Sequence, residues 1–71
     1  MTVRSAERLR AAEEVVAQLR SELGEVGVTL PSLRVDPVSA AGEDAYPLVD
    51  LGRCNLDTAL RLIAVLHEVR R

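Results

Sequence analysis

The sequence predicts a small α+β fold in which two helices pack on an antiparallel β-hairpin, in the order helix, strand, strand, helix. Three observations lead to this prediction: a helical apolar pattern at the start, two short runs of β-branched and apolar residues in the middle, and a strongly apolar helical segment at the end. A chain of 71 residues has room for a single domain, residues 1–71. The expected elements are a helix over about 2–23, strands over about 28–35 and 46–51, and a helix over about 55–70.

The first helix is predicted from apolar residues that recur at spacings of three and four. They are Leu9, Ala12, Val16, Leu19 and Leu23. Thr2 or Ser5 is expected to cap the start of this helix, and Gly24 is expected to end it. The same spacing also fits a coiled coil between subunits. It extends over only about two and a half heptads, which favours packing within the chain.

The middle of the chain predicts the hairpin. Pro31 cannot donate a hydrogen bond to a ladder, so a kink at Pro31-Ser32 is expected to turn four apolar side chains inward, those of Val28, Leu30, Leu33 and Val35. Residues 36–45, with the acidic pair Glu43 and Asp44, are expected to form a surface loop without a regular element. This connection is too short for a crossover helix, so the strands should be antiparallel.

The last helix is the most apolar segment of the chain. Asn55 is expected to cap it, Asp57 lies in its first turn, and Arg70 and Arg71 lie in its last turn, as the helix dipole favours. Its apolar residues are Leu56, Ala59, Leu60, Leu62, Ile63, Val65, Leu66 and Val69. They leave only a narrow polar strip, so the helix should be covered on two sides.

A chain this short has little with which to cover both sides. Small domains commonly gain stability from disulfides, a metal or an oligomeric partner. One cysteine and one histidine give poor support to the first two. The sequence therefore predicts a homodimer or a complex with another protein, with the contacts made by Leu60, Ile63, Leu66 and Val69.

The sequence contains no catalytic, metal-binding or cofactor-binding motif. Cys54, just before the last helix, lacks a neighbouring histidine or a second cysteine, which thiol chemistry would need. His67 lacks a second ligand at helical spacing, because Ile63 occupies that position. The carboxylates of the middle segment lack the ligand spacing of a calcium loop. We therefore expect no enzymatic activity and no cofactor, although an enzyme that uses Cys54 is a further alternative.

Charge and composition narrow the choice of partner. The net charge is -2 and Tyr46 is the sole aromatic residue, which argues against nucleic acid as a partner. No apolar run approaches the roughly 20 residues needed to cross a membrane, and the start does not resemble a signal peptide. We expect a cytoplasmic protein. The main expectation is a non-enzymatic protein–protein interaction module with an accessory or regulatory role.

The alternative is a DNA-binding transcriptional regulator that presents arginines. Residues 55–66 resemble the closing helix of lambda-repressor-type helix-turn-helix domains, of the form Leu-x-Thr-x-x-x-Leu-Ala-x-x-Leu. In that family this helix packs the core and does not read DNA. The rest of the chain departs from the family, which has about five helices where this sequence predicts two and a hairpin.

Overall fold

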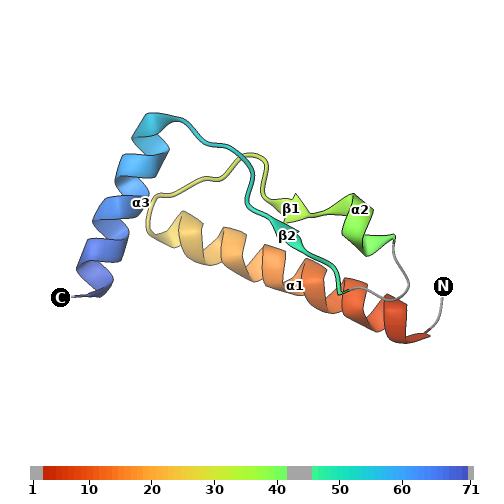
Figure 1. Ribbon diagram of the computed structural model, residues 1–71. Coiled ribbons are helices and arrows are strands. Elements are labelled where there is room, and N and C mark those ends of the chain that lie inside the picture. Colours follow the sequence, from red (N-terminus) through yellow and green to blue (C-terminus); the bar gives the residue numbers. More distant parts are fainter. Residues whose placement is uncertain (1–2, 42–45, 71) are drawn as a thin grey trace.

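The computed structural model describes residues 3–41 and 46–70. Along these residues lie α1 (Val3–Glu25), β1 (Arg34–Val35), α2 (Pro37–Ala40), β2 (Val49–Asp50) and α3 (Leu56–Val69) (Figure 1). The two strands pair antiparallel, with Arg34 opposite Asp50 and Val35 opposite Val49. The predicted small α+β fold with its helix, strand, strand, helix layout is confirmed. Thr2, Glu43, Asp44 and Arg71 lie outside the described residues, so the expectations for them stay predictions.

One face of α1 packs against the rest of its own chain. Val16 is buried, and the residues that share its face, Leu9, Ala12, Leu19 and Leu23, are half-buried. This face of α1 therefore takes part in packing within the chain. The helix continues through Gly24, two residues past its expected end. Gly27 makes the turn instead, with a positive φ of 79° that only glycine adopts easily.

The segment after this turn supplies the core. The N–H of Val28 donates to the carbonyl of Leu23 at 2.8 Å, and the Val28 side chain is only 1% exposed. At Pro31 and Ser32 the chain turns, as predicted, and Leu33 becomes buried beyond the turn. Arg20 Nη2 donates to the Leu33 carbonyl at 2.8 Å, which fastens α1 to the start of the hairpin. Among the described residues, the buried core is Val16, Val28 and Leu33.

Both strands are much shorter than predicted, with two residues each. The Pro31-Ser32 turn delays the start of β1, and the helical turn of α2 begins directly after it. β2 ends before Gly52, which has a φ of 74°. One hydrogen bond extends the pairing, from the N–H of Asp36 to the carbonyl of Leu48 at 2.8 Å.

The short helix α2 contradicts the prediction of a loop without a regular element. Asp36 caps it, because its Oδ2 accepts a hydrogen bond from the N–H of Ser39 at 3.1 Å. Pro37 occupies the first helical turn, where its missing N–H costs nothing. The Ser39 hydroxyl then accepts a hydrogen bond from the N–H of Leu48 at 2.8 Å, so α2 helps to hold the second half of the hairpin.

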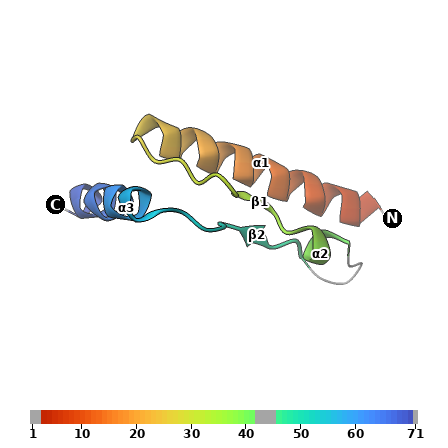
Figure 2. The ribbon, with the colours of Figure 1, turned by 90° about the horizontal axis from the view of Figure 1, so that it is seen from above.

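The long helix α1 lies beside the hairpin, and α3 lies beyond the end of α1 (Figures 1 and 2). After β2 the chain runs extended through residues 51–55 and carries α3 away from the strands. The two helices therefore do not form the joint cover of the hairpin that the sequence suggested. The result is an elongated molecule with principal extents of 43, 22 and 17 Å.

Gly52 should be intolerant of a side chain. A Cβ at this position would lie 2.5 Å from the Ser32 Cβ and 3.1 Å from the Ser32 carbonyl, at a positive φ. We expect Gly52→Ala to lower the free energy of unfolding by about 2 kcal/mol, measured by urea denaturation at one fixed chain concentration.

Gly24→Ala is the matched control. A Cβ there meets no atom within 4 Å, and the residue is helical, so this variant should be unchanged or more stable by up to about 1 kcal/mol. Equal stability of Gly52→Ala and the unmodified protein would contradict the role given to this turn.

Candidate protein-interaction surface

The first turns of α3 attach it to the rest of the chain. Asn55 caps the helix as predicted, because its Oδ1 accepts a hydrogen bond from the N–H of Thr58 at 2.8 Å. Asp57 lies in the first turn, where its charge complements the helix dipole. Further along, Arg61 Nη1 donates to the carbonyl of Gly27 at 3.4 Å. This last hydrogen bond joins α3 to the turn that follows α1.

The side chains of α3 divide into a half-covered side and an open side. The half-buried residues are Thr58, Ala59, Leu62 and Val65, and no residue of the helix is fully buried. Five large apolar side chains are 53% to 81% exposed: Leu56, Leu60, Ile63, Leu66 and Val69. We call these five residues the α3 apolar face. Leu56, Leu60 and Ile63 lie on the side opposite the half-buried residues, whereas Leu66 and Val69 continue the half-covered side, four residues after Leu62 and Val65. The chain therefore covers one side of the first half of its most apolar helix and leaves the rest of the apolar side chains open.

The four predicted contact residues all belong to this face. Leu60, Ile63, Leu66 and Val69 are each more than half exposed, so their side chains are available to a partner. Their role in contacts stays a prediction. The contact residues predicted from the sequence did not include Leu56, which is 81% exposed. Its spacing of four from Leu60 is the signal that puts it on the same face.

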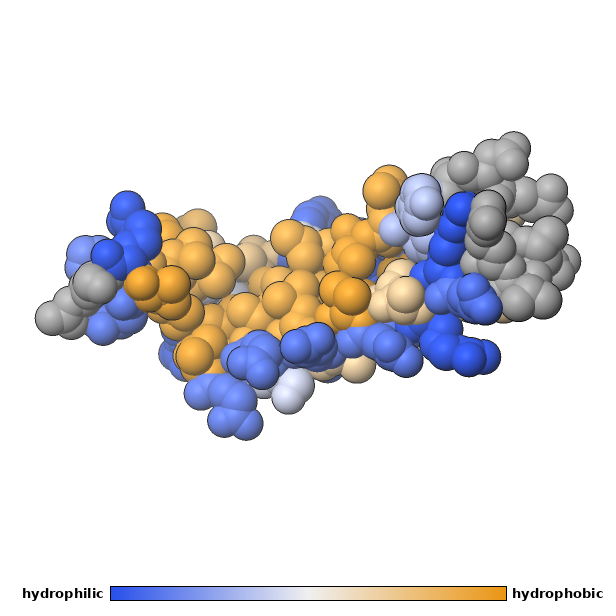
Figure 3. Space-filling view, turned by 90° about the horizontal axis from the view of Figure 1, so that it is seen from below, coloured by the Kyte–Doolittle hydropathy of each residue, from blue (hydrophilic) through white to orange (hydrophobic). Residues whose placement is uncertain are grey.

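Apolar side chains continue from α3 toward the middle of the molecule (Figure 3). The exposed apolar residues outside α3 include Leu48 and Leu51 in the second half of the hairpin and Val15 on α1. A shallow groove of about 290 Å³ lies between α1 and the hairpin, and its lining includes Ala12, Val15 and Val49. Arg8 also lines it, with its guanidinium carbon 4.2 Å from the centre of the Tyr46 ring. The open apolar surface is thus larger than α3 alone.

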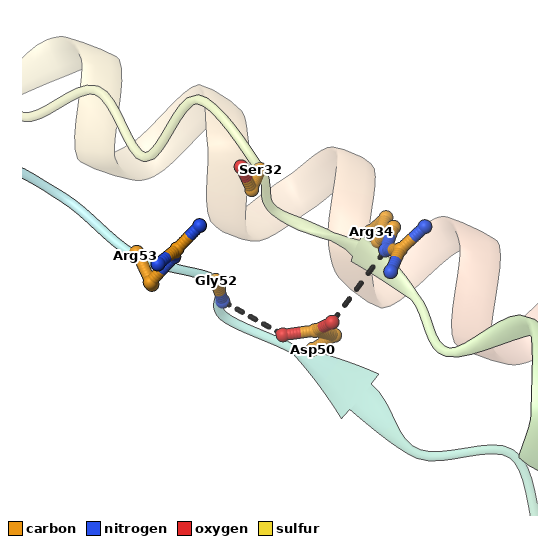
Figure 4. Close-up of a pocket in the computed structure, with 5 residues that line it drawn as sticks. All are labelled: Ser32, Arg34, Asp50, Gly52 and Arg53. Atoms are coloured by element: carbon orange, nitrogen blue, oxygen red, sulfur yellow. Dashed lines mark hydrogen bonds and ion pairs between the residues drawn. The ribbon is translucent and has the colours of Figure 1, made fainter.

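A polar pocket of about 640 Å³ lies where the hairpin meets Gly52 (Figure 4). Asp50 is its central group, with Oδ1 accepting from the N–H of Gly52 at 2.8 Å and Oδ2 lying 3.5 Å from Nε of Arg34. Ser32 and Arg53 complete the lining. Both carboxylate oxygens of Asp50 therefore contact neighbouring groups of the pocket.

Cys54 and His67 lie near opposite ends of α3, and both are exposed. The structure therefore does not bring the cysteine and the histidine together as a catalytic pair. In residues 3–41 and 46–70, no three histidine, cysteine or acidic side chains are grouped in a way that could hold a metal ion.

Two further findings concern the chain as a whole. No helix among the described residues has the length and apolar composition needed to cross a bilayer. Comparisons with protein-family models, curated proteins and solved structures returned no match. The description of the surface therefore rests on the geometry of this chain alone.

The stability of the chain should depend on the Asn55 cap of α3. Replacing Asn55 with Ala removes the acceptor for the Thr58 N–H, and we expect a loss of about 1 kcal/mol in the free energy of unfolding. Asn55→Asp keeps a capping oxygen and should retain most of the stability. Urea denaturation of both variants measures the difference. Identical curves for Asn55→Ala and the unmodified protein would show that the cap does not contribute.

Proposed function

We propose that this protein is a small non-enzymatic protein–protein interaction module that acts as a homodimer, in an accessory or regulatory role. The observation that carries the proposal is the α3 apolar face. Isolated exposed apolar residues are common on soluble proteins, but a contiguous apolar surface is typical of an interaction site. Here Leu56, Leu60 and Ile63 follow one another along a helix whose other side is already in use.

The total accessible surface of the chain supports the proposal that a partner covers part of it. The accessible surface is 5684 Å². A compact monomer of the same mass, 7.7 kDa, would expose about 4,300 Å². The radius of gyration agrees, at 14.4 Å against about 11 Å for a compact chain of this length. The single chain, at 5684 Å², therefore exposes about 1,400 Å² more than expected.

This excess is of the size that a permanent interface buries. Standard complexes bury about 800 Å² per partner, and obligate homodimers bury about 1,000 Å² or more per partner. Obligate interfaces are also the more apolar class, which matches the aliphatic side chains exposed on α3.

A charge in the middle of the α3 apolar face should separate the dimer. Leu60 is 62% exposed within the chain, and glutamate is a good helix former, so Leu60→Glu should leave the monomer folded. In the dimer the new carboxylate would be buried without a partner, and the dissociation constant should rise at least about a hundredfold. Sedimentation velocity over a dilution series measures this change, and circular dichroism checks the helix content.

Val38→Glu is the matched control, because Val38 is 81% exposed but lies on α2. It should dissociate at the same concentration as the unmodified protein. A folded Leu60→Glu variant with an unchanged dissociation constant would sink the proposal that this face forms the contact.

A further inference from the structure

The hairpin has an open edge along β2. The backbone of Leu48 is directed inward, because its C=O accepts from the N–H of Asp36 at 2.8 Å and its N–H donates to Ser39 Oγ at 2.8 Å. Asp50 pairs with Arg34 of β1. Because the N–H and C=O of one trans peptide point in opposite directions, the groups bonded to these inward groups point away from β1. They are the C=O of Pro47, the N–H and C=O of Val49 and the N–H of Leu51.

These outward groups have no partner within the chain. In residues 3–41 and 46–70, no hydrogen bond reaches any of them. The outer edge of β1 differs, since the C=O of Leu33 accepts from Arg20 and its N–H donates to the C=O of Leu30. An open strand edge is a template for a further strand. A two-stranded hairpin is also marginally stable alone, so pairing at this edge would stabilise it.

The apolar groove between α1 and the hairpin runs beside the open edge. Ala12 and Val15 line it from α1, and Pro47 and Val49 line it from the edge itself. Val15 is 53% exposed and Val49 is 36% exposed. Because the groove borders the edge, a single contact can cover both the unpaired backbone groups and these apolar side chains.

The order of donors and acceptors along the edge fits a second copy of the same strand. From Pro47 to Leu51 the outward groups alternate as acceptor, donor, acceptor, donor, with Val49 at the centre. A two-fold axis through Val49 brings the N–H of each Val49 to the C=O of the other. The same axis brings the C=O of Pro47 to the N–H of Leu51 of the partner subunit. An antiparallel pair in this register therefore satisfies every outward group.

We infer that β2 pairs antiparallel with β2 of a second copy of this chain, with Val49 at the two-fold axis. The two hairpins form a continuous sheet, and both copies of α1 lie on the same face of it. Neighbouring strands are about 4.8 Å apart. Two helices that each lie over their own hairpin are then about 10 Å apart, a usual distance between packed helices. This inference rests on the proposed homodimer and adds a contact to the α3 apolar face.

Other registers fit the edge less well. With Asp50 on the axis, the two copies of Asp50 would lie directly opposite each other, where like charges repel. With Leu48 on the axis, the C=O of Val49 would face Pro47 of the partner subunit, which has no N–H to donate. Both shifts lose interactions that the Val49 register keeps.

The exposed area of the chain also favours a second copy at this edge. The chain, at 5684 Å², exposes about 1,400 Å² more than a compact monomer would. The β2 contact covers Val15 and Val49 in both copies. It therefore extends the buried surface beyond α3, toward the area of about 1,000 Å² or more per partner that obligate homodimers bury.

A cysteine at position 49 tests the pairing. In the Val49 register the two Cα atoms of residue 49 are about 5.5 Å apart, within the range that a disulfide spans. The experiment uses the full chain with Cys54→Ser as the background, mild oxidation, and non-reducing gel electrophoresis. Leu48→Cys is the matched control on the same strand, because the two copies of residue 48 would be about 8 Å apart. Val49→Cys should form a covalent dimer at least about ten times faster than Leu48→Cys.

Amide hydrogen exchange tests the same contact without a substitution. The N–H groups of Val49 and Leu51 are unpaired in the single chain. In NMR measurements they should exchange at least about tenfold more slowly at concentrations where the chain is dimeric than where it is monomeric. The N–H of Val28 is the control, because it donates to the C=O of Leu23 within the chain and should change much less.

The outcomes separate this contact from the proposed homodimer. A dimer in which Val49→Cys links no faster than Leu48→Cys, and in which the two N–H groups exchange alike at all concentrations, would overturn the β2 contact alone. Faster linking by Leu48→Cys would overturn the register. Linking through residue 49 in a dimer that Leu60→Glu does not weaken would support the β2 contact and remove the role of the α3 apolar face. A chain that stays monomeric at every concentration would overturn both.

Discussion

The fold depends on one small apolar contact between α1 and the segment that follows it, whose buried side chains are Val16, Val28 and Leu33. The Gly27 turn returns the chain to this contact, and the hydrogen bond from Arg20 to the Leu33 carbonyl holds it at the start of β1. Because a two-stranded hairpin is marginally stable alone, its position relies on the packing of these side chains against α1. In the part of the chain that the structure describes, no other apolar side chains are fully buried.

The small size of this core explains why α3 is so exposed. A chain of 71 residues can remove only about 60% of its surface from water. Here α1 and the segment around Val28 use each other's apolar faces, and α1 ends at Glu25, so it does not extend along α3. α3 then has the Gly27 turn as its neighbour and keeps its opposite side open. The apolar surface on α3 stays exposed because the apolar side chains of α1 and of the segment around Val28 cover each other and not α3.

Much of the fold could be predicted because its signals are local. Apolar spacing predicted α1, and Asn55 with Asp57 predicted the start of α3. Strand lengths could not be predicted, since they depend on the close approach of Gly52 to Ser32, two positions far apart in the sequence. The signal for α2 was present in Asp36-Pro37, a cap followed by proline, but was interpreted as a loop. The open side of α3 depends on where α1 ends relative to α3, which apolar spacing within α3 does not encode.

The same residues connect the stability of the chain to its association. α3 is held against the rest of its chain by a hydrogen bond from Arg61 and four half-buried side chains, and the Asn55 cap stabilises its first turn. Those contacts are few for a helix of 14 residues. Because most helical stability in proteins comes from tertiary packing, further packing from a partner would stabilise α3. A partner that covers Leu60 and Ile63 would bind the folded chain and not the unfolded one, and would stabilise it by mass action. If the partner is the proposed second copy, holding α3 in position and binding that copy are two parts of one equilibrium.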